Sequence, residues 1–233
     1  MCKRKPIFLV VLAVAILMVI GSGIAQADYW IFGYSGGAAN YLDVTTGAGP
    51  STLSTAGTLN PGGYNQGWWS GTYANSAGNT NYFVGVINVT NKLNDFFTFN
   101  ISGLAGQTVT SADLRVYTYG INSPGNLNYY LYDVSTNAAT LNYTAGTNAA
   151  IYTDLGSGVK YGTFTISPSE AYSTITLNLD AAAIANLNSA IGASSTYFSI
   201  GGTVTPVPEP CTLILLGSGL VGLAAFRKRH KRV

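Results

Sequence analysis

The chain has 233 residues, of which 47% are apolar and 9% are charged, and its formal net charge is +2. Most of its basic residues lie near the two ends, so that 28–206 contains three basic and eight acidic side chains and has a net charge of −5. Because the only histidine and both cysteines also lie outside this span, the body lacks the residues for nucleic-acid binding, histidine acid–base catalysis, a cysteine nucleophile, a His/Cys zinc site or a disulfide.

The first 27 residues have the pattern of a secretory signal peptide. Basic residues at 3–5 precede an uninterrupted apolar run at 7–20. Ala25 and Ala27 fit an A-x-A cleavage site, which places the start of the mature chain at Asp28. The alternative is an uncleaved anchor helix, but the apolar run is short for a membrane span. We therefore expect cleavage after Ala27.

Short stretches of alternating polar and apolar residues recur through the second half of the body. In one of them Phe97, Phe99 and Ile101 fall on the same face of an extended chain. Turn-forming residues separate these stretches. We expect strands at 82–90, 95–101, 113–119, 128–134, 160–166, 173–179 and 196–200. Strands at this spacing predict an all-β fold, a β-sandwich of jelly-roll-like type.

One short helix interrupts the predicted strands. Asp180 can cap its N-terminus, an apolar stripe runs from Ile184 to Ile191, and Gly192 stands where a C′ glycine belongs. We expect this helix to cover one end of the sandwich. The segment at 28–81 is rich in Gly, Ser and Thr, and we expect it to add a pair of strands or a loop layered on the sandwich.

Several aromatic residues could form a sugar-binding face, since a ring stacks on the apolar face of a pyranose while amide groups bond its hydroxyls. The candidates are Tyr64, Trp68, Trp69, Tyr73 and the pair Tyr129-Tyr130. The alternative, which we favour, is that these rings pack within the β-fold. In an extended chain Trp68 and Trp69 would point to opposite faces, so only one of them could serve as a platform.

The acidic residues offer a calcium site and paired carboxylates as further hypotheses. Asp133, Asn137 and Asp154 could ligate calcium, although there is no Asp-x-Asp-x-Asp-Gly loop and we favour turn-capping roles. A glycosidase would need a carboxylate pair, such as Asp133 with Asp154 or Glu170 with Asp180. We favour the alternative without catalysis, and we expect no catalytic residue, no metal and no cofactor.

The C-terminal segment has three parts in a fixed order. The sequence Pro-Val-Pro-Glu-Pro at 206–210 is rigid and extended, because each proline fixes its own φ and restricts the residue before it. An uncharged apolar run follows at 211–226 and is expected to be a transmembrane helix. Arg227, Lys228 and Arg229 begin a basic cluster that would stop transfer and stay on the cytoplasmic side.

This order at 207–233 resembles the PEP-CTERM sorting signal of Gram-negative, exopolysaccharide-producing bacteria. The resemblance implies that Pro208, Glu209 and Pro210 are recognised by exosortase, a membrane enzyme that processes the protein. Cys211 departs from the small residue that the family often has there. Residues 82–204 also look like a recurrent secreted β-domain of such proteins, a family with no assigned catalytic activity to carry over. It lies in the segments Phe97–Leu104, Val109–Tyr117, Leu131–Val134, Asp154–Gly158, Tyr161–Gly162 and Phe198–Gly202.

We therefore expect a signal peptide at 1–27, an extracellular β-sandwich domain at 28–206 and a sorting signal at 207–233. The protein would cross the inner membrane, be anchored there and reach the cell surface or the extracellular space. The leading hypothesis is a non-catalytic surface or matrix protein of a biofilm. Its expected partners are exosortase, the membrane and exopolysaccharide. A carbohydrate-binding module is the alternative, and a polysaccharide-active enzyme is the third hypothesis.

Overall fold

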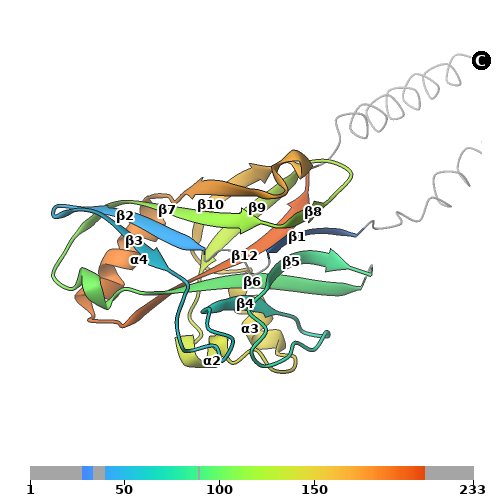
Figure 1. Ribbon diagram of the computed structural model, residues 1–233, viewed down its shortest axis with the longest axis horizontal. Coiled ribbons are helices and arrows are strands. Elements are labelled where there is room, and N and C mark those ends of the chain that lie inside the picture. Colours follow the sequence, from blue (N-terminus) through green and yellow to red (C-terminus); the bar gives the residue numbers. More distant parts are fainter. Residues whose placement is uncertain (1–27, 34–39, 89, 208–233) are drawn as a thin grey trace, which may run out of the picture.

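Strands make up most of the molecule in the computed structural model, which describes residues 28–33, 40–88 and 90–207 (Figure 1). The strands are β1 (Tyr29–Gly33), β2 (Tyr41–Thr46), β3 (Gly49–Ser54), β4 (Gln66–Trp69), β5 (Tyr82–Ile87), β6 (Asn91–Asn100), β7 (Val109–Thr118), β8 (Gly120–Asn122), β9 (Leu127–Asp133), β10 (Lys160–Ile166), β11 (Ser173–Asn178) and β12 (Tyr197–Pro206). Three α-helices, α2 (Ala138–Asn142), α3 (Ala149–Leu155) and α4 (Ala181–Gly192), and two 3-10 turns, η1 (Ser102–Leu104) and η2 (Pro168–Glu170), complete the described chain.

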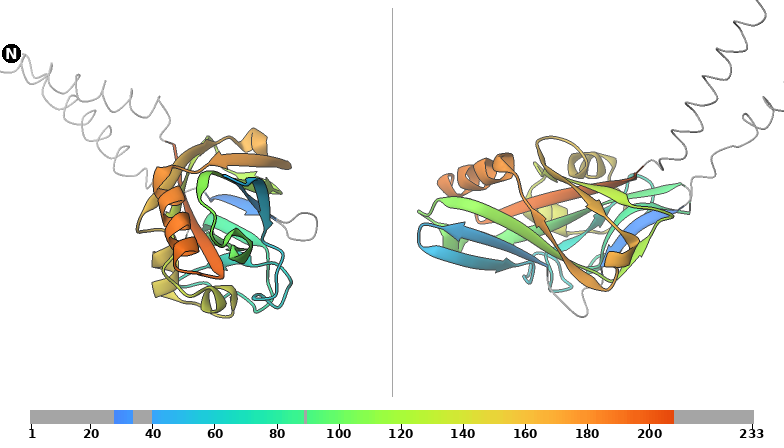
Figure 2. Two further views of the ribbon diagram at one scale, coloured as in Figure 1. Left: turned by 90° about the vertical axis from the view of Figure 1, so that its left-hand side faces the viewer. Right: turned by 90° about the horizontal axis from the view of Figure 1, so that it is seen from above.

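Two antiparallel sheets form the two layers of a sandwich (Figures 1 and 2). The larger sheet has the order β10-β9-β12-β6-β5-β1-β8, and β4 joins it by pairing with β6. The smaller sheet has the order β11-β7-β2-β3. The predicted all-β class and two-sheet arrangement are therefore confirmed.

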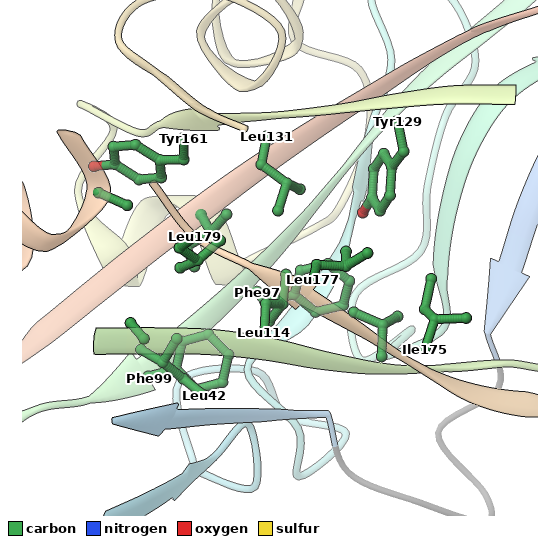
Figure 3. Packing of buried hydrophobic residues seen from close by; sticks show 14 of the residues in the cluster. Leu42, Phe97, Phe99, Leu114, Tyr129, Leu131, Tyr161, Ile175, Leu177 and Leu179 are labelled. Carbon is green, nitrogen blue, oxygen red and sulfur yellow. The ribbon is translucent and has the colours of Figure 1, made fainter. Parts of the chain in front are cut away.

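The main core lies between the two sheets and follows the period-2 pattern of the strands. In β7 the side chains of Leu114 and Val116 are fully buried, whereas Arg115 and Tyr117, which alternate with them, are half-buried on the other face. Alternation of this kind directs every second residue of a strand into the core. Side chains from both sheets meet in this core, as Figure 3 shows for Leu42, Leu114 and Leu177 opposite Phe97, Phe99 and Leu131.

The predicted helix is present as α4 and lies over one end of the sandwich (Figure 2). Oδ1 of Asp180 accepts hydrogen bonds from the first turn, and Leu187 and Ile191 are buried. The prediction of a C′ glycine is wrong, because Gly192 still belongs to the helix. Ser194 instead takes the left-handed conformation after the helix, with φ of 57°.

The prediction of a single helix is also wrong, since α2 and α3 lie outside the larger sheet (Figure 1). Asparagine side chains cap both helices, Asn137 for α2 and Asn148 for α3. A second apolar cluster holds these helices against the sheet, and it consists of Trp69, Phe96, Leu141, Ile151 and Leu155. As a result β6 is buried on both of its faces.

Of the two alternatives predicted for 28–81, added strands and a layered loop, the structure has strands, and they are integral parts of both sheets. Strand β1 lies between β5 and β8, and β2 lies between β7 and β3. Within the described ranges no helix is both long and apolar enough to cross a membrane. The predicted signal helix at 1–27 and transmembrane helix at 211–226 lie outside these ranges.

Candidate functional site

The end of β12 leads directly into the predicted sorting segment. This strand lies between β9 and β6 in the larger sheet, and the backbone N–H of Val207 donates a 2.9 Å hydrogen bond to the carbonyl of Asn126. The start of β1 and the end of β12 lie at the same end of the sandwich (Figure 1). The predicted cleavage, recognition and stop residues lie outside the described residues, and these are Ala25, Ala27, Pro208, Glu209, Pro210, Arg227, Lys228 and Arg229.

The four aromatic residues predicted as sugar contacts at 64–73 do not form one open face. Trp68 and Trp69 are only 6% and 4% exposed. The indole N–H of Trp69 donates a 2.9 Å hydrogen bond to the carbonyl of Leu141, while Trp68 stacks on Tyr73 with 5.7 Å between ring centroids. Neither tryptophan therefore presents an open ring to a sugar. Tyr73 is 42% exposed, and Tyr64 is half-buried.

Asp133 and Asp154 support loops rather than each other. Asp154 accepts hydrogen bonds from the backbone N–H and hydroxyl groups of Ser135 and Thr136. Burial acts to raise the pKa of Asp154, but the hydrogen bonds from Thr136 and Ser135 outweigh it and hold this pKa below its usual value. Oδ1 of Asp133 accepts a hydrogen bond from the backbone N–H of Val159.

The other polar candidates occupy caps. Asn137 caps α2, Asp180 caps α4, and Glu170 forms a reciprocal capping box with Ser167 at η2. In the part of the chain that the structure describes, no three His, Cys, Asp or Glu side chains gather closely enough to hold a metal ion.

A groove of about 630 Å³ lies where the end of β9, the start of α2, α4 and the start of β12 meet. This volume is in the range of small-molecule binding sites, which lie between about 300 and 1,000 Å³. Three aromatic residues line it. Tyr161 and Phe198 are buried and stack at 6.0 Å, whereas Tyr197 is half-buried. None of the four aromatic residues at 64–73 lines this groove.

The polar side chains of the groove are amides, hydroxyls and one carboxylate. Asp133 is the only charged residue in its lining. Asn186 of α4 uses its amide N–H to donate a 3.1 Å hydrogen bond to the hydroxyl of Tyr161, whose ring points towards that helix in Figure 3. Because an amide has both donors and an acceptor, the carbonyl oxygen of Asn186 is left for other bonds.

Ser199 also lines the groove, and its hydroxyl lies next to that of Thr98. Thr98 accepts a 3.1 Å hydrogen bond from the amide of Asn142, and its hydroxyl lies 2.8 Å from that of Ser199. Either hydroxyl of this pair can donate to the other, because each has one hydrogen and an oxygen that accepts two bonds.

A carboxyl group lies in the main core, away from the groove. Asp95 is fully buried in β6, where Oδ2 accepts a 2.7 Å hydrogen bond from the hydroxyl of Tyr129. Oδ1 makes no hydrogen bond with any described residue. Burial raises the pKa of Asp95 to about 7, although the hydrogen bond from Tyr129 acts in the opposite direction. Tyr129 is itself fully buried, so it is not an exposed sugar contact.

Sequence reasoning missed Tyr197, Ser199 and Asn186 as candidate site residues. The stretch at 196–200 was expected to be a strand, and its alternation places Tyr197 and Ser199 on the face opposite to Ile200. That pattern indicates an outer face but not a groove, because the groove forms only when α2 and α4 pack beside β12.

Comparison with known families identifies the C-terminal segment. The family model of the PEP-CTERM protein-sorting motif matches residues 206–229, which confirms the resemblance seen in the sequence. No curated protein matches the chain. The motif indicates a protein that exosortase sorts towards the cell surface. The family model does not cover the sandwich, so the expected likeness of 82–204 to a recurrent secreted β-domain stays a prediction.

Proposed function

We propose, from the premise that the chain is a PEP-CTERM sorting-signal protein, that it is a non-catalytic surface or matrix protein associated with exopolysaccharide in a biofilm. The observation that carries the proposal is the motif at 206–229. In this proposal the protein crosses the inner membrane of a Gram-negative bacterium, is held by the segment at 211–226 and is then processed by exosortase at Pro208-Glu209-Pro210.

The junction between the sandwich and the motif supports this order of events. The matched segment begins at Pro206, the last residue of β12, so no linker separates the folded domain from the motif. A proline-rich segment is extended and makes few backbone hydrogen bonds of its own. A processing enzyme could therefore bind it as a strand without unfolding the sandwich.

The chemistry of the described residues supports a role without catalysis. Residues 28–207 contain no His or Cys. The acidic side chains at the candidate positions instead hold loops and helix ends, as Asp154, Glu170 and Asp180 do. A carboxylate with that role is already hydrogen-bonded to backbone groups and is poorly placed for proton transfer.

Replacing Glu209 tests the sorting step. Glu209→Ala removes the only charge of the tripeptide and keeps the apolar run, so we expect the full-length protein to remain unprocessed in the membrane fraction. Thr205→Ala, at an exposed position of β12, is the matched control and should be sorted normally. If the Glu209→Ala protein reaches the medium with the wild-type mass and yield, recognition does not depend on this tripeptide.

Association with exopolysaccharide needs a separate test. In a strain that makes no exopolysaccharide, we expect the processed protein to appear in the medium instead of the extracellular matrix. Retention of the same amount at the cell surface in that strain would contradict the proposed association. The second candidate function is a carbohydrate-binding module, and the groove between α2, α4 and β12 favours it.

A further inference from the structure

We infer that the groove between α2, α4 and the start of β12 binds a short segment of neutral glycan. In this site Tyr197 stacks on a sugar ring, while Ser199, Asn186 and Asp133 bond its hydroxyls. The inference rests on the proposed association with exopolysaccharide for its biological setting. To that proposal the inference adds where on the protein the sugar binds and that the sugar is neutral.

The charge of the groove selects neutral sugars over acidic ones. Its lining contains the carboxylate of Asp133 and no Lys or Arg. A uronate, phosphate or sulfate group would be repelled by this carboxylate. The lining also has no cation to compensate for the loss of the group's hydration. Like charges brought together in a partly desolvated site repel each other and weaken binding. The net charge of −5 over 28–206 acts in the same direction.

Three aromatic residues contribute to the lining of the groove. Tyr161 and Phe198 are stacked with an interplanar angle of 16° and form a buried base. Tyr197 is half-buried and, as the strand neighbour of Phe198, points to the other face of β12, so it offers a ring separate from this base. Pyranose rings have an apolar face that packs on such a ring, with the ring hydroxyl left at the wet edge.

The hydrogen-bonding groups match hydroxyls, which both donate and accept. Ser199 offers a hydroxyl, which can donate as well as accept. Asn186 has a free acceptor oxygen, because its N–H groups face the Tyr161 hydroxyl. Asp133 adds carboxyl oxygens as acceptors. A divalent cation fits less well, since a single carboxylate supplies too few of the oxygen ligands that calcium takes.

The test uses the full chain, purified in a detergent without a sugar headgroup, and isothermal titration calorimetry. The neutral probes are cellohexaose, mannohexaose and maltohexaose, and the acidic probe is hexagalacturonate. We expect wild-type protein to bind at least one neutral hexamer and not hexagalacturonate. Tyr197→Ala should weaken that binding about tenfold, and Ser199→Ala about fivefold.

Matched variants separate the groove from other aromatic surfaces. Tyr143→Ala removes a 60% exposed tyrosine that does not line the groove and should bind as wild type does. Tyr73→Ala tests the region that the sequence suggested and should also leave binding unchanged. Ala139→Lys places a cation in the lining and should create binding of hexagalacturonate. Thermal unfolding of each variant shows whether it is folded.

Three results would overturn the inference: no binding of any neutral hexamer, equal binding of hexagalacturonate by wild type, or wild-type affinity in folded Tyr197→Ala and Ser199→Ala. Co-sedimentation with the native exopolysaccharide distinguishes the two proposals. If wild type and the groove variants co-sediment equally, the association stands but the groove is not its site. If wild type itself does not co-sediment, the proposed association fails.

Discussion

The hydroxyl of Tyr129 donates a 2.7 Å hydrogen bond to Oδ2 of Asp95 in the interior of the sandwich, where neither side chain is exposed to solvent. This single bond does not satisfy the carboxyl group, since Oδ1 has no partner among the described residues. A buried carboxylate with one donor is costly, so the neutral form is favoured. Burial accordingly raises the pKa of Asp95 to about 7.

We expect the free energy of unfolding to fall as the pH rises from about 4 to about 7. An unfolded aspartate has a pKa of about 3.9, so in this interval the folded state holds a proton that the unfolded state has lost. The stabilisation is complete below the unfolded pKa and is lost by the folded pKa of about 7. The full change is on the order of 4 kcal/mol.

Urea unfolding at pH 4.5, 6 and 8 measures this slope. Asp95→Asn keeps the shape of the side chain but cannot ionise, so its stability should be nearly constant over the same interval. Asp113→Asn removes a half-buried carboxylate from β7 and should keep the wild-type slope. A wild-type profile that is flat or rises with pH would refute the assignment to Asp95.

Two adjacent glycines of β12 give a second prediction. A Cβ at Gly202 would overlap Oδ1 of Asp95 and lie 2.5 Å from Cε2 of Tyr129, while a Cβ at Gly201 would lie 2.7 Å from the carbonyl oxygen of Leu155. Each alanine substitution should therefore lower the free energy of unfolding by about 1–3 kcal/mol. Gly192→Ala, where nothing lies within 4 Å of the new Cβ, should be neutral or stabilise by up to about 1 kcal/mol. Equal stability of the three variants in urea unfolding would contradict this prediction.

The bond from Trp69 to Leu141 gives a third prediction. Trp69→Phe leaves the buried carbonyl of Leu141 without this donor and opens space in the outer apolar cluster, at a cost of about 2 kcal/mol. Because this bond joins β4 to α2, hydrogen exchange should rise most in α2. Trp30→Phe, at a half-buried position of β1, is the control. Unchanged exchange in α2 of the Trp69→Phe protein would show that the bond does not hold the helix.

The ion pair of the smaller sheet gives a fourth prediction. Arg115 of β7 makes a two-pronged contact with Asp43 of β2, and its guanidinium lies 4.8 Å from the centroid of the Tyr41 ring. The hydrogen bond from Arg115 holds the pKa of Asp43 below its usual value. A lysine ammonium cannot donate two parallel hydrogen bonds to the carboxylate as the guanidinium does. Arg115→Lys should therefore lower the free energy of unfolding by about 0.5–1 kcal/mol in low salt and by less in 1 M NaCl. Lys160→Ala, at an exposed site of β10, should show neither effect.

Strands with a clean alternation could be predicted from the sequence, and strands without it could not. The expected strand at 160–166 coincides with β10, and β7 extends the one expected at 113–119 by a few residues towards the N-terminus. By contrast, β3 has the sequence Gly-Pro-Ser-Thr-Leu-Ser and little apolar pattern. The strand expected at 196–200 continues to Pro206 in β12. Its second half was not predicted, because Gly201 and Gly202 interrupt the strand pattern.

The candidate site was less predictable, because its parts come together only through tertiary packing. Local contacts could be predicted from the sequence. The cap formed by Asp180, for example, needs only the backbone N–H groups two and three residues later. Trp69 and Leu141 lie 72 positions apart, and no local pattern marks their bond. The same applies to the groove, where Tyr197 of β12 and Asn186 of α4 meet only after that helix has docked.

The position of β12 has a mechanical consequence. Hydrogen bonds of an antiparallel ladder run perpendicular to the strands, so a pull along a strand loads all of them in shear, whereas a sideways pull opens them one at a time. Strand β12 is bonded on one side to β6 and on the other to β9, and it ends where the sorting motif begins. Tension along β12, between a membrane-held C-terminus and a matrix-bound sandwich, would therefore load two ladders at once.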